Sequence, residues 1–218
     1  MKKSILSIFS AVLFSASVYT NAQEIEQQLV VENRVNDAKQ QDKPYVILIS
    51  ADGFRYDYAK KHDAKNLQNF AKNGVEAKAM YPSYPSITFP NHYTIVTGLY
   101  PSHHGLVGNQ MLEEATGDRY SLGNREAVIN PKWYGGTPIW NLAEENKMLS
   151  ACYYWPGSEA PINGMFPTYS YKYSEKSPID YRIQEVVNWL QLPAEKRPHL
   201  ITFYFPEVDH AGHTFGPD

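Results

Sequence analysis

The sequence predicts an α/β domain built on a mostly parallel sheet with helices on both faces. Short apolar runs that suit strands alternate with stretches of helical periodicity. The two clearest runs, 44–50 and 199–205, are almost continuously apolar, as strands of a covered parallel sheet are. In such sheets, functional groups collect at the carboxyl ends of the strands.

The first half of the chain predicts two strands and two helices. The run 44–50 is rich in β-branched residues and too short for a helix, so we expect a strand buried on both faces. Apolar residues at helical spacing before Gly74 predict a short amphipathic helix, and 75–80 resembles a second strand. Another helix follows Pro90 and ends at Gly98.

The second half continues this alternation. In order, it predicts a helix over 137–143 with a threonine cap and a proline in its first turn, a strand over 148–154, a helix over 181–192, and the strand 199–205. Two intervening stretches, 102–134 and 156–178, are rich in Gly, Asn, Pro and Tyr. This composition is typical of long functional loops on a rigid scaffold.

The composition excludes several classes of protein. With 43% hydrophobic and 20% charged residues in 218, the chain is of the soluble globular type and is not disordered, collagenous or coiled-coil. Its formal net charge of -3 predicts no nucleic-acid binding by bulk electrostatics, so an anionic substrate has to be held by local chemistry. The single cysteine, Cys152, rules out an internal disulfide and a CxxC pair.

Residues 1–22 have the pattern of a signal peptide. A basic start precedes an apolar run over 5–18, and small residues precede Gln23. The alternatives are a membrane anchor or a buried helix, but the run is shorter than the roughly 20 residues that span a bilayer. We therefore expect export to a periplasmic or extracellular location, with no membrane span after cleavage. Residues 23–43 are polar and predict a tether or a frayed first helix.

Two aspartates follow the two clearest strands. Asp52 comes just after the first, and Gly53 beside it allows close backbone approach. Asp209 comes just after the last, four residues before His213, with Gly212 between them to allow a tight turn. Aspartate and histidine suit Zn²⁺. The alternative is that these residues are helix caps and solvated turn residues.

Thr88 stands where a loop enters a helix. A hydroxyl in this position is close to oriented N–H groups and to the positive end of the helix dipole, which favour an oxyanion and bind phosphate. A threonine alkoxide needs help to form at neutral pH, and a metal ion is one source of that help. The alternative is that Thr88 is only a helix N-cap.

Together, these residues resemble the nucleotide pyrophosphatase/phosphodiesterase family of the alkaline phosphatase superfamily, also called type I phosphodiesterases. The resemblance runs from about Tyr45 to Pro217, through Asp52-Gly53-Phe54-Arg55, the segment 88–101, Gly105, Asn109, Asp209, Gly212-His213 and Gly216-Pro217. It implies an alkaline-phosphatase-like fold. It also implies an exported hydrolase that cleaves phosphodiester or pyrophosphate bonds of small-molecule substrates such as nucleotides.

The resemblance implies a site with two zinc ions. Asp52 and the Thr88 oxygen would bind one ion, and Asp209 and His213 would bind the other. Thr88 corresponds to the nucleophile, which attacks phosphorus in line and forms a phospho-threonine intermediate that water then hydrolyses.

The resemblance also implies residues that contact the substrate. The amide of Asn109 corresponds to a donor to a non-bridging phosphoryl oxygen. Phe89 and Tyr204 match aromatic positions that sandwich a nucleobase or other leaving group, and Tyr173 joins them. The alternative for all three rings is core packing, because aromatic side chains next to strand ends usually pack.

The family has further metal ligands, an Asp-His pair and another His, downstream of the Asp209 motif, whereas this sequence stops at Asp218. The spare histidines lie at positions that the family does not use for metal: His62, His92, His103, His104 and His199. We therefore expect 44–218 to be the N-terminal part of a truncated catalytic domain, inactive alone, whose sheet has an unpaired edge.

Two other functions remain open at this stage. A phosphomonoesterase of the same superfamily shares the metals and the threonine, but it places extra cationic groups on the third phosphate oxygen where a diesterase has an apolar pocket. The three aromatic positions favour the diesterase. From a different class, the chain is compatible with a non-catalytic exported protein that binds nucleotides through its aromatic loops, since it has 17 tyrosines.

Overall fold

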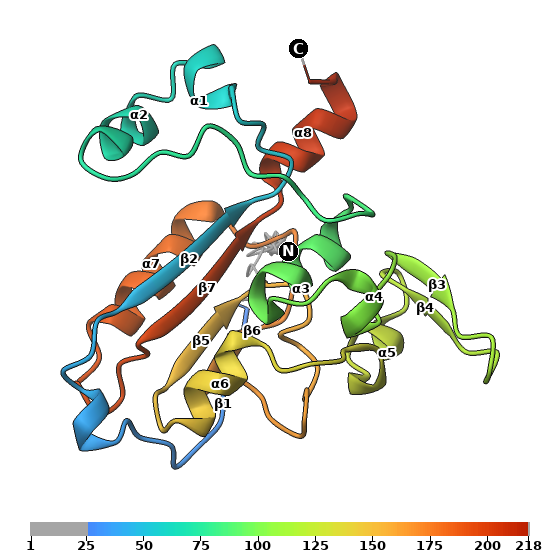
Figure 1. The fold of residues 1–218 in the computed structure, drawn as a ribbon. Coiled ribbons are helices and arrows are strands. Elements are labelled where there is room, and N and C mark those ends of the chain that lie inside the picture. The colour runs from blue at the N-terminus through green and yellow to red at the C-terminus, as the bar shows by residue number, and fades with distance from the viewer. Residues whose placement is uncertain (1–25, 218) are drawn as a thin grey trace, which may run out of the picture.

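A five-stranded sheet with the order β1-β6-β5-β7-β2 forms the centre of the computed structural model, which describes residues 26–217 (Figure 1). Four strands run parallel: β2 (Val46–Ala51), β5 (Ser150–Tyr153), β6 (Tyr169–Tyr171) and β7 (Leu200–Phe205). The short β1 (Leu29–Val30) pairs antiparallel with β6. The prediction of a mostly parallel sheet is confirmed.

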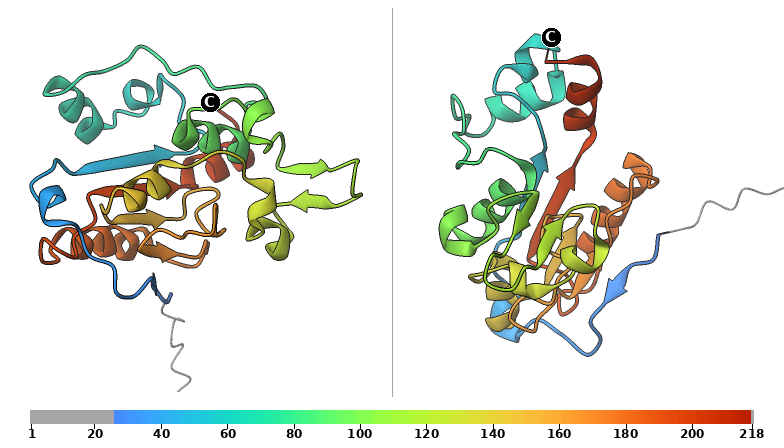
Figure 2. Two further views of the ribbon diagram at one scale, coloured as in Figure 1. Left: turned by 60° about the horizontal axis from the view of Figure 1, so that its bottom comes forward. Right: turned by 90° about the vertical axis from the view of Figure 1, so that its right-hand side faces the viewer.

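Helices cover both faces of this sheet (Figure 2). On one face lie α3 (Thr88–Thr97) and α6 (Ile139–Glu145), and on the other lies α7 (Ile179–Leu190). The smaller helices are α1 (Tyr58–Lys61), α2 (Lys65–Lys72), α4 (Pro101–His104), α5 (Arg125–Val128), α8 (Glu207–Phe215) and the 3-10 turns η1 (Ala38–Gln40) and η2 (Pro131–Trp133). A hairpin of β3 (Gln110–Leu112) and β4 (Arg119–Ser121) completes the described elements.

Aromatic side chains fill the layer between the sheet and α7. Tyr153 and Tyr171 come from the neighbouring strands β5 and β6 and stack with ring centroids 4.4 Å apart. Trp189 of α7 packs against both rings at 5.9 and 6.0 Å. Large rings bury much apolar area per residue, so this layer fixes α7 on the sheet.

The N-terminal part of the described chain is tied into this domain and is not a detached tether. Asn36 is buried; its side-chain N–H groups donate to the carbonyls of Ala194 and Arg197, at 2.8 and 2.7 Å, and its oxygen accepts from the Leu149 N–H. Arg34 reaches the buried carboxylate of Glu144 at 3.3 Å. Where the sequence predicted a tether or a frayed helix, strand pairing of β1 and buried polar groups hold the described part of this segment.

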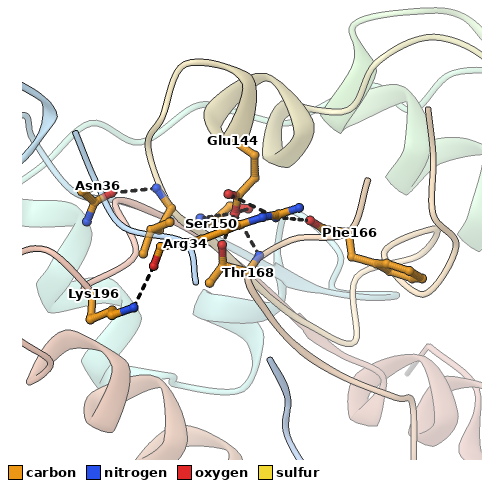
Figure 3. Close-up of polar contacts among 8 residues, drawn as sticks. Arg34, Asn36, Glu144, Ser150, Phe166, Thr168 and Lys196 are labelled. Atoms are coloured by element: carbon orange, nitrogen blue, oxygen red, sulfur yellow. Dashed lines mark hydrogen bonds and ion pairs between the residues drawn. The ribbon is translucent and has the colours of Figure 1, made fainter. Parts of the chain in front are cut away.

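Glu144 is the centre of this anchor (Figure 3). Its Oε1 accepts hydrogen bonds from the N–H and hydroxyl of Ser150, at 2.8 and 2.7 Å, and from those of Thr168, at 2.9 and 2.8 Å. Its other oxygen faces Arg34. A buried carboxylate requires partners of this kind, and here they join α6, β5 and the start of β6 to the N-terminal segment.

Most predicted elements are present within two residues of their expected bounds, but 75–80 is not the predicted strand. Val75 and Met80 are 101% and 74% exposed, and no described strand pairs with this segment. The threonine cap at 137 is also wrong, because the N-cap of α6 is Pro138 and it makes no side-chain cap bond. None of the strands between residues 26 and 217 supplies the backbone hydrogen bonds that a strand over 75–80 would need.

The prediction that the first strand is buried on both faces is wrong. β2 is an edge strand, and Val46 and Ile49 are 54% and 60% exposed. Its apolar pattern resembles that of an internal strand, but no other strand among residues 26–217 pairs with its outer edge. Of the described strands, β2 and β1 lie at the two edges of the sheet.

Two sequence predictions concern the N-terminus and the membrane. The signal peptide over 1–22 lies outside the described residues, as do residues 23–25. Between residues 26 and 217, no helix has the length and apolar character needed to span a bilayer. The single cysteine, Cys152, is a buried free thiol.

Candidate active site

The carboxyl ends of β2 and β7 bring the two candidate aspartates together. The parallel register pairs Ala51 with Phe205, so the residues that follow each strand emerge at one edge of the sheet. Gly53 has a φ of +69°, and a Cβ on it would lie 2.8 Å from the Cα of Asp209. Glycine is therefore required here, both for its positive φ and for the close approach of the two backbones that carry Asp52 and Asp209.

Asp52 is held by hydrogen bonds to both carboxylate oxygens. The Gly53 N–H donates to Oδ1 at 3.0 Å, and the Tyr204 hydroxyl donates to Oδ2 at 2.8 Å. Asp52 does not cap the next helix, since α1 begins only at Tyr58. Burial, together with the neighbouring Asp52 charge, raises the pKa of Tyr204, so this phenol stays protonated and continues to donate.

Asp209 and His213 lie one helical turn apart on α8. The His213 Nε2 is 3.6 Å from Asp209 Oδ2, and the two side chains are 79% and 29% exposed. Gly212 lies inside this helix, so the expected tight turn is wrong and the helical i, i+4 spacing is what brings the pair together. His210 instead faces Glu175, with 4.0 Å between its Nε2 and the carboxylate.

Thr88 is the first residue of α3, which begins at this edge of the sheet. The N-cap is Ile87, in an extended conformation, so the interpretation of Thr88 as the cap is wrong. The next N–H, of Phe89, donates to Asn109 Oδ1 at 3.1 Å. Because that bond occupies the amide oxygen, the NH₂ group of Asn109 is the end available to donate to a ligand.

His92 contacts the backbone of Thr88, and sequence reasoning placed it only among the spare histidines. Its Nδ1 is 2.7 Å from the Thr88 carbonyl oxygen, and its Nε2 is 2.7 Å from the hydroxyl of Ser50 on β2. Burial lowers the pKa of His92, against the raising effects of its backbone hydrogen bond and of Asp52 and Asp209. The sequence signal for this contact was its spacing four residues after Thr88, one turn of the helix.

The three candidate aromatic residues differ in exposure. Tyr204 is only 6% exposed, so its ring is covered and its visible role is the bond to Asp52. Tyr173 is 38% exposed and packs edge-on against Tyr154 at 5.2 Å, with Tyr204 6.5 Å away. Phe89 is partly buried against Tyr120. Tyr173 and Phe89 therefore offer partly exposed rings, whereas Tyr204 does not.

The candidate metal ligands fit zinc in kind. Asp52 and the Thr88 hydroxyl supply oxygen donors, and Asp209 with His213 adds one oxygen and one nitrogen, a mixture that zinc accepts. The contact between Gly53 and Asp209 holds the backbones that carry Asp52 and Asp209 close together. In number they fall short, because residues 26–217 contain no group of three or more His, Cys, Asp or Glu side chains placed to hold one ion.

Comparison with known protein families gives one match over most of the chain. Residues 46–218 match the family described as type I phosphodiesterase / nucleotide pyrophosphatase. The chain is 44% identical over 178 residues to ectonucleotide pyrophosphatase/phosphodiesterase family member 3 of Mus musculus. The aligned region covers 81% of this chain and 20% of that protein. It is also 44% identical over 174 residues to an uncharacterized pyrophosphatase/phosphodiesterase of Schizosaccharomyces pombe, covering 79% of the chain and 36% of that protein.

Solved structures give the same result. Murine ectonucleotide pyrophosphatase / phosphodiesterase 5 superposes with a TM-score of 0.75 and 34% identity, over 80% of this chain and 46% of that one. An inactive threonine-to-alanine variant of the murine protein, in complex with AMP, superposes with a TM-score of 0.76 and 32% identity, over 81% and 46% of the two chains. The chain thus spans under half the length of these solved relatives and a fifth to about a third of the two curated ones.

Proposed function

The chain belongs to the type I phosphodiesterase / nucleotide pyrophosphatase family, and on that basis we propose that the protein hydrolyses phosphodiester or pyrophosphate bonds of nucleotides. The observation that carries this proposal is that three groups lie near the carboxyl ends of β2 and β7. Thr88 begins α3 there, Asn109 is bonded to the next N–H, and the backbone of Gly53 touches that of Asp209. A hydroxyl, an amide donor and paired carboxylates are what phosphoryl transfer to an enzyme nucleophile needs.

Thr88 is the proposed nucleophile. Its oxygen attacks phosphorus in line, the bond to the leaving ester or phosphate oxygen breaks, and a phospho-threonine forms. Water then cleaves the new P–O bond and regenerates the hydroxyl. The N-terminal N–H groups of α3 favour the negative charge that develops on the phosphoryl oxygens. The inactive threonine-to-alanine variant of the murine relative supports a threonine in this role.

The proposed cofactor is a pair of zinc ions, with Asp52 and Thr88 at one and Asp209 and His213 at the other. When bound, zinc would lower the pKa of the attacking hydroxyl and neutralise charge on the phosphoryl group. The chain's own contribution is to fix the donors. Tyr204 orients Asp52, and the helical spacing on α8 orients Asp209 and His213.

The proposed substrate contacts are divided between polar and aromatic groups. The NH₂ group of Asn109 donates to a non-bridging phosphoryl oxygen, and the partly exposed rings of Phe89 and Tyr173 stack on the nucleobase. Tyr204 acts beneath them through Asp52 and not as a face of the sandwich. The AMP bound to the murine relative supports a nucleotide as the substrate class.

We also propose that the protein is exported, to the periplasm or the extracellular space, with residues 1–22 removed as a signal peptide. Support comes from the sequence pattern and from the mouse relatives, which are named ectonucleotide pyrophosphatase/phosphodiesterases. N-terminal sequencing of protein recovered from outside the cytoplasm tests this. A start at Gln23 supports the proposal, and a retained Met1 contradicts it.

The hydrolytic function is tested by measuring the turnover of a bis-aryl and a mono-aryl phosphate by the full-length product of the gene, with and without zinc. We expect zinc-dependent turnover that is faster on the diester and that Thr88→Ala abolishes. Thr97→Ala is the matched control, because this threonine lies in the same helix and its hydroxyl bonds to the backbone of Tyr93 and Leu99, neither of which is a proposed site residue. Faster turnover of the monoester would favour the phosphomonoesterase, and zinc-independent nucleotide binding without turnover would favour a pure binding protein.

A further inference from the structure

His92 links the two strand-end segments that carry the proposed nucleophile and the first carboxylate. It lies in the second turn of α3, and its side chain reaches back to the carbonyl of Thr88 in the first turn, with Nδ1 at 2.7 Å. Its Nε2 lies 2.7 Å from the hydroxyl of Ser50, the last residue but one of β2. Ser50 stands two residues before Asp52.

The hydrogen-bond partners fix the proton on the imidazole. A backbone carbonyl oxygen only accepts, so Nδ1 must carry a hydrogen and donate it to Thr88. The hydroxyl of Ser50 then donates to Nε2 when that nitrogen has no hydrogen. The bond to the Thr88 carbonyl, in which Nδ1 can only be the donor, thus assigns the Nδ1–H tautomer to His92.

The surroundings of His92 prevent its ring from turning. The residue is 5% exposed, and the rings of Trp155 and Tyr204 meet it edge-on at 5.4 and 5.0 Å. The Trp155 Nε1–H also donates to the His92 carbonyl at 3.1 Å. Because Tyr204 donates in turn to Asp52, the contacts form a chain from Thr88 through His92 and Tyr204 to a proposed metal ligand.

We propose that His92 is a positioning residue, which locks the first turn of α3 to the end of β2 and so holds Thr88 at a fixed place relative to Asp52. This inference rests on the proposed function for its consequence, since the value of the lock is a correctly placed nucleophile. The contacts themselves do not depend on that function. Replacing an outer contact that orients a metal ligand typically costs roughly 10- to 100-fold in metal affinity or activity.

His104 is a buried histidine of the same chain that does not have this positioning role. It is 1% exposed, and its Nε2 lies 3.0 Å from the Thr94 hydroxyl. Its Nδ1 accepts from the Leu106 N–H at 3.1 Å, so its hydrogen is on Nε2, the opposite tautomer. His104 contacts none of the proposed site residues through these bonds and is therefore a matched control within the same chain.

The first experiment reads the tautomers by ¹⁵N NMR of histidine-labelled protein without metal. We expect His92 to show a protonated Nδ1 and an unprotonated Nε2, and His104 to show the reverse. His92→Gln and His104→Gln assign the two signals. A His92 without hydrogen on Nδ1 overturns the proposed link to the Thr88 carbonyl.

The second experiment measures the order parameter of the Thr88 γ-methyl group by NMR relaxation. We expect it to fall in His92→Gln, to fall less in Ser50→Ala, and to stay at the wild-type value in His104→Gln. Ser50→Ala keeps the test decisive if His92→Gln does not fold. An unchanged Thr88 methyl in Ser50→Ala, or an equal fall in His104→Gln, overturns the positioning role. Neither measurement involves turnover, so the proposed hydrolysis fails or survives separately in the Thr88→Ala assay.

Discussion

The backbones of Gly53 and Asp209 are in direct contact: a Cβ on Gly53 would lie 2.8 Å from the Cα and 3.0 Å from the N of Asp209. Two segments that are far apart in the sequence therefore meet with no side chain between them. This contact, and not a side-chain interaction, sets how closely the loop after β2 approaches the first turn of α8. Both proposed carboxylate ligands depend on it.

Gly53→Ala is expected to destabilise the protein and to weaken zinc binding. The positive φ costs an alanine roughly 1 kcal/mol, and the close approach to Asp209 adds roughly 1–3 kcal/mol because backbone has to move. Gly164→Ala is the control, because Gly164 has a φ of +75° but nothing within 4 Å of its added Cβ. Urea denaturation and zinc titration measure both variants. Equal losses in the two would show that the contact with Asp209 contributes nothing.

Tyr204→Phe is expected to weaken zinc binding by roughly 10- to 100-fold while leaving the fold intact. The change removes the hydroxyl that donates to Asp52 Oδ2 and keeps the buried ring. Tyr171→Phe is the matched control, since its hydroxyl donates to the Glu185 carboxylate at the same distance of 2.8 Å but away from the site. Calorimetric zinc titration gives the affinities. If both variants bind zinc like the wild type, Tyr204 does not orient a metal ligand.

The sequence was sufficient for the parts of this fold that local pattern determines. Continuous apolar runs predicted β2, β5 and β7, and helical periodicity before Pro193 predicted α7. The position of Asp52 and Asp209 after two strands predicted that they meet, because parallel strands end at one edge. The place of Thr88 where a loop enters a helix made it a candidate beside an alternative as a cap. The resemblance then supplied its role as nucleophile and added Asn109, which no periodicity could have distinguished from an ordinary loop residue.

The rest required tertiary partners that a local pattern does not encode. The apolar residues of 75–80 predicted a strand that does not form, and the apolar run of β2 gave no sign that it lies at an edge. Gly212 suggested a turn, yet α8 continues through it, since one glycine inside a helix costs only about 1 kcal/mol relative to alanine. The roles of Tyr204 and His92 depend on contacts between elements that the sequence does not place side by side.

Glu144→Gln is expected to cost roughly 2 kcal/mol of the free energy of unfolding and to loosen the N-terminal segment. The amide keeps an oxygen for Ser150 and Thr168 but sets an NH₂ group against Arg34, so a buried ion pair is lost. Urea denaturation measures the first effect, and limited proteolysis within 26–43 measures the second. The exposed neighbour Glu145→Gln is the control, with an expected change within about 0.5 kcal/mol. Unchanged protease resistance in Glu144→Gln would contradict the anchoring role of this carboxylate.

The stability of the protein is expected to fall as the pH drops from about 6.5 toward about 4, in part through His104. Burial lowers the pKa of His104 from the ordinary value of 6.5 to about 4, so in this window the unfolded chain binds a proton that the folded chain does not. The free energy of unfolding therefore decreases with falling pH, by at most about 3 kcal/mol from this one group.

The contribution of His104 is isolated by comparison with His104→Gln, which has no group to protonate at that position. Urea denaturation at a series of pH values should show the wild type more stable near pH 7, with its advantage shrinking as the pH falls through the window between the two pKa values. Carboxylates that titrate in the same range act in both proteins, so they cancel in the difference. A difference that stays constant from pH 7 to pH 4 would mean that His104 accepts its proton as readily in the folded protein as in the unfolded chain.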